Sequence, residues 1–263
     1  MANRNDFLAS IRNGLKTEDN YSFSMDARSL SPPLENVMPV IPAEKLLDQF
    51  EAELRALDCN THRASSLSML EGILRLIVDS AAVRQVVISR NPLVAQLEIA
   101  AMVERWGKRA AVWPSGVLEP LEAAAFRDEC FAAEVGIRGA DFALAETGSL
   151  VLTSLSEGSQ LASLAPPTHV VLYRRSQLRG SLDEVLQNLP VPADPNRPSA
   201  ARSVVFVTGA SRTADIEQIL VRGVHGPREL HAILVEEACL VGSPLLSMEG
   251  ATVPPVVPAK NNC

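Results

Sequence analysis

The sequence predicts an α/β fold, in which a mostly parallel sheet is flanked by helices. Short runs of β-branched residues, at 83–89, 109–114 and 168–173, alternate with stretches of helical periodicity. Strands that alternate with helices of about 10–15 residues are typical of parallel sheets. The chain has 263 residues, of which 47% are hydrophobic and 21% charged, so it can bury the core of one α/β domain and is not disordered throughout.

The composition excludes several classes of function. Twenty-four basic and 31 acidic residues give a formal net charge of −7, which is not the basic footprint of a nucleic-acid-binding protein. No apolar run approaches the roughly 18 residues needed to span a bilayer, and the first 15 residues are too polar for a signal peptide. We therefore expect a cytoplasmic protein without a membrane span. The cysteines are far apart and predict reduced thiols, not disulfides or an iron–sulfur cluster: Cys59, Cys130, Cys239 and Cys263.

The chain divides into three predicted parts. Residues 1–42 combine an amphipathic helix with a Ser/Pro-rich strap; the helix has one apolar face, formed by Phe7, Leu8, Ile11 and Leu15. Residues 43–242 form a single α/β domain. Residues 243–263 form a loose, proline-rich tail, since proline lacks the amide that helices and strands use.

The first half of the α/β domain is predicted from apolar spacing. Leucine, isoleucine and phenylalanine recur at three or four residues over 46–57 and 65–80, which predicts two helices. A β-branched strand at 83–89 follows, and then a helix, a second strand that Pro114 ends, and another helix. We assign these three elements to residues 92–106, 109–114 and 119–134, and expect the next strand to begin at 135–137.

The second half contains less regular signals. Strands are expected at 168–173, 203–208 and 230–235, again from β-branched runs. Ser181 and Glu184 form a capping box that opens a helix to about residue 189. A further helix is expected at about 214–222.

The segment 140–153 contains the first candidate site. Two apolar stretches flank Glu146, Thr147, Gly148 and Ser149, and Gly148 can adopt the positive φ of a tight turn between antiparallel strands. A carboxylate in such a setting is a candidate catalytic acid, base or nucleophile. Alternatively, Glu146 is structural, bonded to turn amides or paired with an arginine such as Arg138 or Arg212.

The second candidate site is the loop 209–213, which we expect to lie between a strand and a helix. Amides at a helix start favour anions, and the hydroxyls of Ser211 and Thr213 with the Arg212 guanidinium would complete a carboxylate or phosphate site that starts at Gly209. In the alternative, Thr213 is an ordinary N-cap, Asp215 a first-turn acid and Arg212 a surface charge. The hypothesis requires that this loop and the Glu146 turn meet in space.

Common catalytic motifs are absent from the sequence. It contains no dinucleotide-binding glycine motif, P-loop, H-E-x-x-H or G-x-S-x-G, so we expect no bound cofactor. His225 and His231 are six residues apart, a spacing that no zinc motif uses, and no metal site is expected. His225 could act as a general base or contact a ligand from its loop. His62 and His169 show no pattern.

Four blocks in order resemble the LutC/YkgG family of LUD-domain lactate-utilisation proteins: GIRGADFALAETGSLVL, PPTHVVL, VTGASRTADIE and VRGVHGPRELHAILVE. The likeness covers residues 136–237 strongly, and FLASIRNGL resembles the family's first helix. It implies a fold similar to the NagB/RpiA/CoA-transferase class. Motif positions carried over are Glu146, Thr147, Gly148, Ser211, Thr213, Asp215, Glu217, His225, Gly226 and Pro227.

The resemblance implies a role in a bacterial complex that oxidises L-lactate to pyruvate. Because this chain lacks clustered cysteines, it would be a non-redox subunit that acts with iron–sulfur and other lactate-utilisation proteins and binds a small carboxylate or a partner. An alternative is a stand-alone acyl- or CoA-transferase-like enzyme, since Glu146 before Thr-Gly resembles the nucleophilic glutamate of that class. A third is an interaction scaffold that uses the apolar face of residues 7–15.

Overall fold

The computed structural model describes residues 40–80, 82–114, 120–154, 160–189, 203–214 and 220–240. The chain divides into two units, Met1–Val40 and Ile41–Cys263, and all described residues except Val40 belong to the second. The predicted helix and strap of residues 1–42 lie outside the described residues except for residues 40–42, and the predicted tail of residues 243–263 lies outside them entirely. Their boundaries stay predictions.

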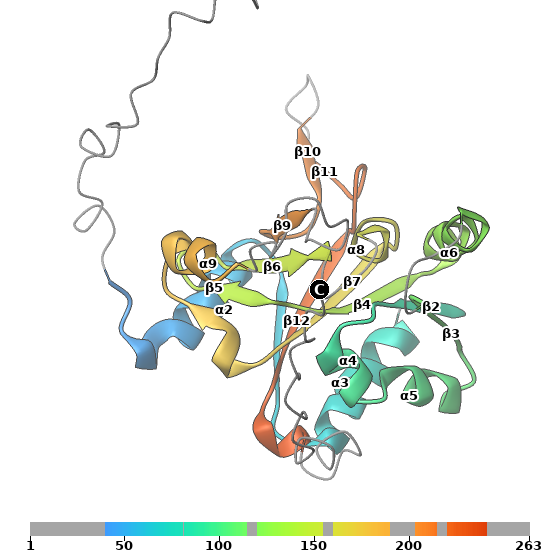
Figure 1. The fold of residues 1–263 in the computed structure, drawn as a ribbon, viewed down its shortest axis with the longest axis horizontal. Coiled ribbons are helices and arrows are strands. Elements are labelled where there is room, and N and C mark those ends of the chain that lie inside the picture. The colour runs from blue at the N-terminus through green and yellow to red at the C-terminus, as the bar shows by residue number, and fades with distance from the viewer. Residues whose placement is uncertain are drawn as a thin grey trace, which may run out of the picture. The chain divides into compact units, whose positions relative to one another are not determined.

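A six-stranded parallel sheet forms the centre of the described unit, with strand order β1-β12-β7-β4-β2-β3. Its strands are β1 (Asn60–Ala64), β2 (Gln85–Ile88), β3 (Arg109–Val112), β4 (Val135–Gly139), β7 (Thr168–Tyr173) and β12 (Glu229–Val235). This sheet confirms the predicted fold class (Figure 1). Strand β1 was not predicted, because it is an edge strand with only Ala64 buried and its sequence carries no apolar alternation.

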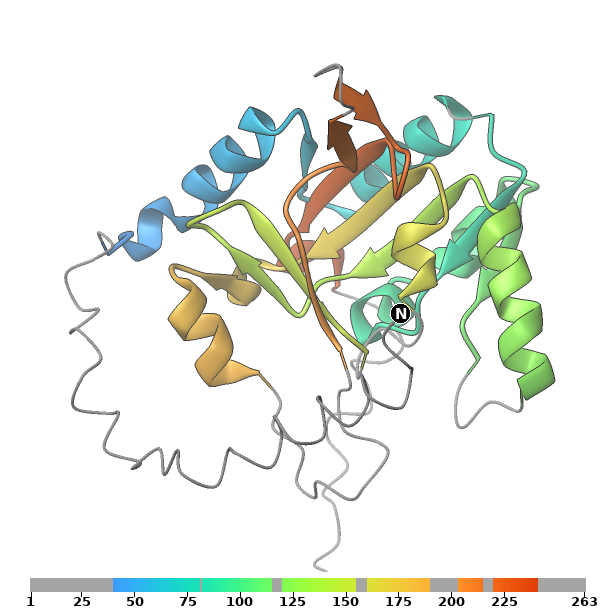
Figure 2. The same cartoon turned by 90° about the horizontal axis from the view of Figure 1, so that it is seen from above.

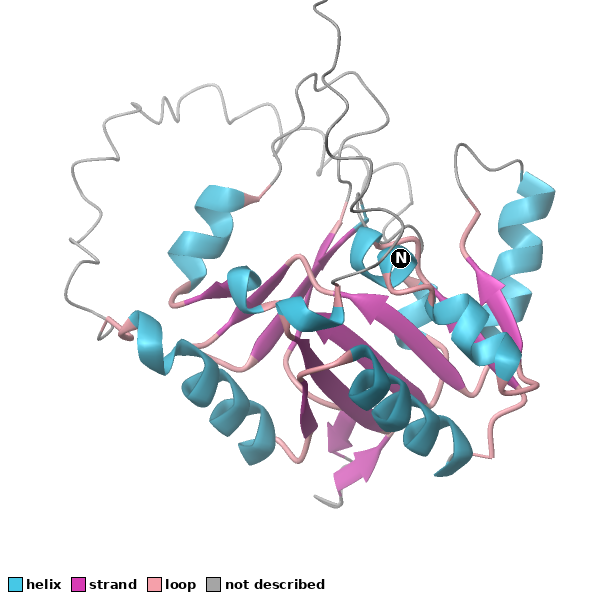
Figure 3. Ribbon diagram, turned by 90° about the horizontal axis from the view of Figure 1, so that it is seen from below, coloured by secondary structure: helices cyan, strands magenta, loops and turns pink. Residues whose placement is uncertain are grey.

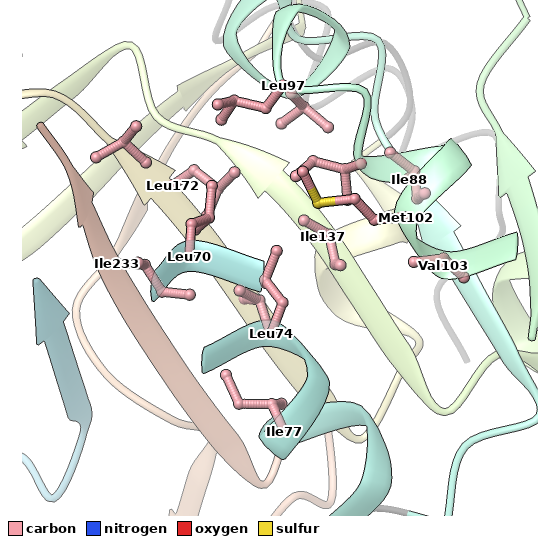
Figure 4. Close-up of a cluster of buried hydrophobic side chains, with 14 of the residues drawn as sticks. Leu70, Leu74, Ile77, Ile88, Leu97, Met102, Val103, Ile137, Leu172 and Ile233 are labelled. Carbon is pink, nitrogen blue, oxygen red and sulfur yellow. The ribbon is translucent and has the colours of Figure 1, made fainter. Parts of the chain in front are cut away.

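One face of this sheet is covered by α3 (Leu67–Ser80), α4 (Pro92–Gln96) and α5 (Ile99–Arg105). Figure 4 shows their apolar side chains meeting those of the strands, with Leu70 and Leu74 of α3 near Ile137 and Leu172. The prediction of one helix over 92–106 is wrong, because the helix breaks at Glu98, which has a φ of 52°. A left-handed residue interrupts the run of helical hydrogen bonds.

The opposite face is covered by α2 (Leu46–Ala56), α6 (Pro120–Ala132), α8 (Leu161–Leu164) and a second sheet. Figures 2 and 3 show helices on both sides of the strands. Helix α2 buries Phe50 and Leu54 completely against the large sheet, and Phe50 packs edge-on against Tyr173 of β7 at a ring distance of 5.1 Å. This layer holds both candidate segments from the sequence.

The second sheet has the order β8-β5-β6-β9, and its strands are β5 (Phe142–Leu144), β6 (Ser149–Thr153), β8 (Leu178–Arg179) and β9 (Val204–Val207). The predicted antiparallel pair in 140–153 is confirmed as β5 and β6. Helix α9 (Leu182–Asn188) packs Val185 against the outer face of these two strands. The capping prediction is confirmed in part, since Ser181 Oγ accepts a hydrogen bond from the Glu184 amide at 3.3 Å.

Strand β9 and the residues after it differ from the prediction. Strand β9 runs antiparallel to β6, and a hairpin of β10 (Arg212–Ala214) and β11 (Leu220–Arg222) follows where a helix was expected. The prediction of a helix at 214–222 is therefore wrong, because residue 214 and residues 220–222 belong to strands. Short apolar runs do not separate helix from strand by period alone, and here the two ends of the run pair with each other. Short 3-10 helices complete the described elements: η4 (Ala43–Lys45), η5 (Arg175–Gln177) and η6 (Glu237–Cys239).

Candidate functional site

The turn between β5 and β6 brings Glu146, Thr147 and Gly148 against helix α2. Leu144 and Ser149 pair at the turn, and Gly148 has a φ of 65°. A Cβ atom at position 148 would lie 2.8 Å from both Glu53 Cβ and the Leu54 amide nitrogen. Two independent features therefore require glycine at position 148: the left-handed backbone and the close approach of the helix.

Hydrogen bonds between hydroxyl groups join this turn to the loop after β9. Thr147 Oγ1 lies 2.6 Å from Ser149 Oγ, which in turn lies 2.6 Å from Thr208 Oγ1. The pairing of Leu150 with Val207 places Ser149 and Thr208 next to each other. The structure thus places the Glu146 turn next to Thr208, the residue before the loop 209–213. However, Glu146 and Thr147 line one cavity, whereas Gly209 and Ser211 line another.

The Glu146 carboxylate makes a structural contact. Its Oε2 accepts a hydrogen bond from the Leu182 amide at 3.1 Å, at the first turn of α9. An acidic side chain at this position satisfies a free amide and interacts favourably with the helix dipole. Glu146 also lines a cavity of about 270 Å³, together with Leu144, Thr147, Ser149, Leu182 and Phe206.

Arg212 is bound to the end of helix α2. Its guanidinium donates to the Leu57 carbonyl at 2.5 Å and to Asp58 Oδ2 at 2.9 Å, and Arg222 donates to the same Asp58 oxygen at 2.6 Å. Asp58 has a φ of 56°, so these arginines stabilise the left-handed residue after the helix. The guanidinium expected to hold a ligand carboxylate therefore binds a carboxylate of the protein itself.

The remaining predicted residues fall into three groups. Thr213 pairs with Val221 in the hairpin, and its place as the N-cap of a helix is not observed. Asp215 and Glu217 lie outside the described residues. Gly209, Ser211 and His225 line one cavity of about 210 Å³. Its full described lining is Ser163, Leu164, His169, Val205, Phe206, Val207, Thr208, Gly209, Ser211, His225, Gly226, Pro227 and Leu230.

Two backbone hydrogen bonds hold the loops around this cavity together. The Ser211 amide donates to the Pro227 carbonyl at 2.9 Å, and the Gly223 amide donates to the Ser211 carbonyl at 3.0 Å. A Cβ atom on Gly226 would lie 3.2 Å from Ser211 Cβ, so a small residue is favoured there. His225 is exposed at the cavity, next to these contacts.

The position of this cavity corrects the sequence argument. That argument placed the loop 209–213 between a strand and a helix, so that the amides of the helix start would bind an anion. However, β9 belongs to the second sheet, and the cavity reaches His169 and Leu230, the second residues of β7 and β12. The cavity therefore lies at the amino end of these two parallel strands, beneath β9.

The sequence analysis missed two buried polar residues beside the cavity. His169 is 1% exposed, and its pKa is lowered to about 3. The main cause is burial, and the positive charge of Arg138 lowers the pKa further. Arg138 is completely buried and donates to Gln160 Oε1 at 2.8 Å and to Ser163 Oγ at 2.7 Å. The available signal was a charged residue inside the apolar run of strand β4, since such residues are almost never buried without partners.

The described residues show neither a metal site nor a membrane-spanning helix. No three His, Cys, Asp or Glu side chains among them gather in a way that could hold a metal ion. No helix within the described ranges is both long and apolar enough to cross a bilayer.

Comparisons with known proteins show which family the chain resembles. The family model described as LUD domain matches residues 47–235. Lactate utilization protein C of Exiguobacterium sp. is 26% identical over 238 residues, which cover 90% of this chain and 97% of the relative. The uncharacterized protein YkgG of Escherichia coli is 26% identical over 246 residues, which cover 90% of this chain and 100% of the relative.

A solved structure is similar in fold. The crystal structure of a DUF162 family protein from Deinococcus radiodurans superposes with a TM-score of 0.51 at 22% identity. The match covers 74% of this chain and 99% of that one. At this identity the likeness concerns the fold alone.

Proposed function

The chain belongs to the LUD domain family, and from this premise we propose that it is a lactate utilization protein C-like component of a bacterial system that oxidises L-lactate to pyruvate. Relatives that carry this name match the chain over nearly their whole length. The observation that carries the proposal is the meeting of two family-like blocks, since the turn of residues 146–149 and the loop that begins at Thr208 share a hydrogen bond. We also place the protein in the cytoplasm.

We propose that the chain itself is a non-redox subunit that acts with iron–sulfur and other lactate-utilisation proteins. The described cysteines, Cys59, Cys130 and Cys239, are buried in three different apolar clusters. Burial raises the pKa of each thiol, and that of Cys130 rises to about 12. Since the thiolate is the form that ligates metals, this environment favours inert structural thiols.

Genetics and reconstitution together test this role. A strain that lacks the gene should lose growth on L-lactate but keep growth on pyruvate, and the wild-type gene should restore it. The purified chain alone should reduce no dye with L-lactate, whereas extract that contains the co-expressed partners should. Lactate oxidation by the isolated chain would contradict the non-redox role, and normal growth of the deletion strain would contradict the pathway.

The alternative is a stand-alone acyl- or CoA-transferase-like enzyme with Glu146 as nucleophile. It is supported by the position of Glu146 in the wall of the 270 Å³ cavity. The hydrogen bond from the Leu182 amide to Glu146 Oε2 favours the structural role instead. Incubation with acyl-CoA and mass spectrometry decide between them: an adduct on Glu146 that is absent from Glu146→Gln supports the enzyme, and no adduct rejects it.

A further inference from the structure

A buried histidine beside the 210 Å³ cavity has a ring nitrogen without a hydrogen-bond partner among the described residues. His169 is 1% exposed and forms part of the cavity wall, and its Nε2 atom is buried and unsatisfied. A buried polar atom without a partner destabilises the folded protein, because it has lost its hydrogen bonds to water. A molecule in the cavity could supply the missing partner.

Two further polar side chains of the same wall are available to a ligand. Ser211 and His225 line the cavity, and their side chains make no hydrogen bond to the described residues. The other hydroxyls are already engaged, because Ser163 Oγ bonds Arg138 and Thr208 Oγ1 bonds Ser149. The available polar residues of the cavity wall therefore come from strand β7 and from the Ser211 and His225 loops.

The charges around the cavity favour an anion. Its described lining contains no carboxylate side chain. The buried Arg138 guanidinium acts on His169, where its positive charge opposes protonation of the ring. A negatively charged group placed beside His169 would interact favourably with the same guanidinium.

The size and the apolar walls of the cavity limit the ligand further. Sites for drug-sized ligands are usually about 300–1,000 Å³, and this cavity is about 210 Å³. Leu164, Val205 and Leu230 supply apolar surface in the same cavity. The best match is a short acid that carries one small alkyl group and a second polar oxygen.

We propose that this cavity binds a small 2-hydroxy or 2-oxo monocarboxylic acid, with His169 Nε2 and Ser211 Oγ as hydrogen-bonding partners. The choice of acid rests on the proposed role in lactate utilisation. The polar wall, the buried imidazole and the volume are independent of that role.

The test is a titration of the full chain, labelled with ¹⁵N in its histidines and followed by NMR. L-lactate or pyruvate at millimolar concentration should shift the His169 ring nitrogens in a saturable way and leave the His62 signals in place. Propionate, which lacks the 2-oxygen, should bind up to about tenfold more weakly, as expected for the loss of one hydrogen bond. Inorganic phosphate is the control ligand, because a general anion site would bind it as well as a 2-hydroxy acid. Equal binding of phosphate and lactate would contradict the proposal.

Variants make the result specific to the cavity. Ser211→Val should block ligand entry and abolish the shift, whereas His62→Gln, on strand β1, should leave binding unchanged. His169→Phe should abolish binding, and its melting curve checks that it folds; the Ser211→Val result stands if it does not. Absence of any His169 shift, or binding that Ser211→Val does not affect, would overturn the proposal.

The two proposals can fail separately. If lactate growth depends on the gene but no acid shifts His169, the cavity inference fails and the proposed function stands. If the acids bind but the deletion strain grows normally on L-lactate, the proposed function fails and the binding site stands.

Discussion

Ser149 Oγ lies 2.6 Å from Thr208 Oγ1, although 59 positions separate the two residues in the chain. Ser149 is buried, and it bridges two exposed residues, Thr147 and Thr208, through their hydroxyls. This small network fixes the position of the Glu146 turn relative to the loop that lines the 210 Å³ cavity. It is therefore the contact on which any joint role of the two segments depends.

Removal of the bridging hydroxyl should loosen this contact. We expect Ser149→Ala to lower the free energy of unfolding by about 1 kcal/mol, because two hydrogen bonds are lost while the threonines can bind water instead. Urea unfolding measures the change. In a double-mutant cycle with Thr208→Val, the two effects should sum to more than that of the double variant; simple additivity would show that the bond contributes nothing.

Two glycines should respond to alanine with opposite signs. Gly148→Ala should destabilise the protein by more than about 1 kcal/mol, since alanine disfavours a φ of 65° and its Cβ would meet helix α2. Gly72 is the matched control, because it is exposed inside helix α3 and a Cβ atom there would meet no atom within 4 Å beyond its chain neighbours and the nearby helix backbone. Gly72→Ala should stabilise by about 0.5–1 kcal/mol. Thermal and urea unfolding of both variants test the pair.

Stability should fall as pH decreases below the ordinary histidine pKa of about 6.5. Burial lowers the pKa of His62, His169 and His231 in the folded state, so the unfolded chain binds protons more readily. This contribution to stability is complete above about pH 6.5 and is lost as the pH falls towards the folded-state values. Urea unfolding between about pH 7 and pH 5 should show the decline while most carboxylates stay ionised.

The histidines contribute to this decline in different ways. His62 Nε2 and His231 Nδ1 lie 3.1 Å apart, so protonation of both would place two cations in contact. His169→Leu and His62→Gln should each flatten the pH dependence, and His225→Gln, at an exposed position, serves as the control. An unchanged slope in His169→Leu would show that this ring does not titrate with unfolding.

The Asp58 contacts predict a modest structural role for Arg212. Arg212→Lys should lower the free energy of unfolding by about 0.2–1 kcal/mol, as for other exposed ion pairs, because the lysine ammonium does not take the position of the single guanidinium nitrogen that donates to both Leu57 and Asp58. Asp58→Asn, which tolerates the left-handed backbone, should have a similar effect. Calorimetry with L-lactate should give equal affinities for wild type and Arg212→Lys. A loss of affinity of about tenfold in Arg212→Lys, equivalent to about 1.4 kcal/mol, would show that Arg212 contacts the ligand.

The apolar patterns of the chain were sufficient to predict most elements of the parallel sheet and its helices. Every residue of β2 and β7 is buried, so each strand appears in the sequence as a short, continuous β-branched run. Helix α3 buries Leu70, Leu74 and Ile77 on one stripe, so its period indicates a helix directly. The break at Glu98 and the edge strand β1 were missed, because neither a single left-handed residue nor a half-exposed strand changes the apolar period.

The sequence by itself determined the α/β class, the tight turn at Gly148 and the family-like blocks that contain the candidate residues. Only the tertiary structure decided that Arg212 binds Asp58, that residues 212–222 begin and end as paired strands, and that His169 and Arg138 lie beside the cavity. The physical reason is that turns and apolar stripes depend on neighbouring residues, whereas the partner of a charge or a buried imidazole is supplied by strands and loops distant in the chain.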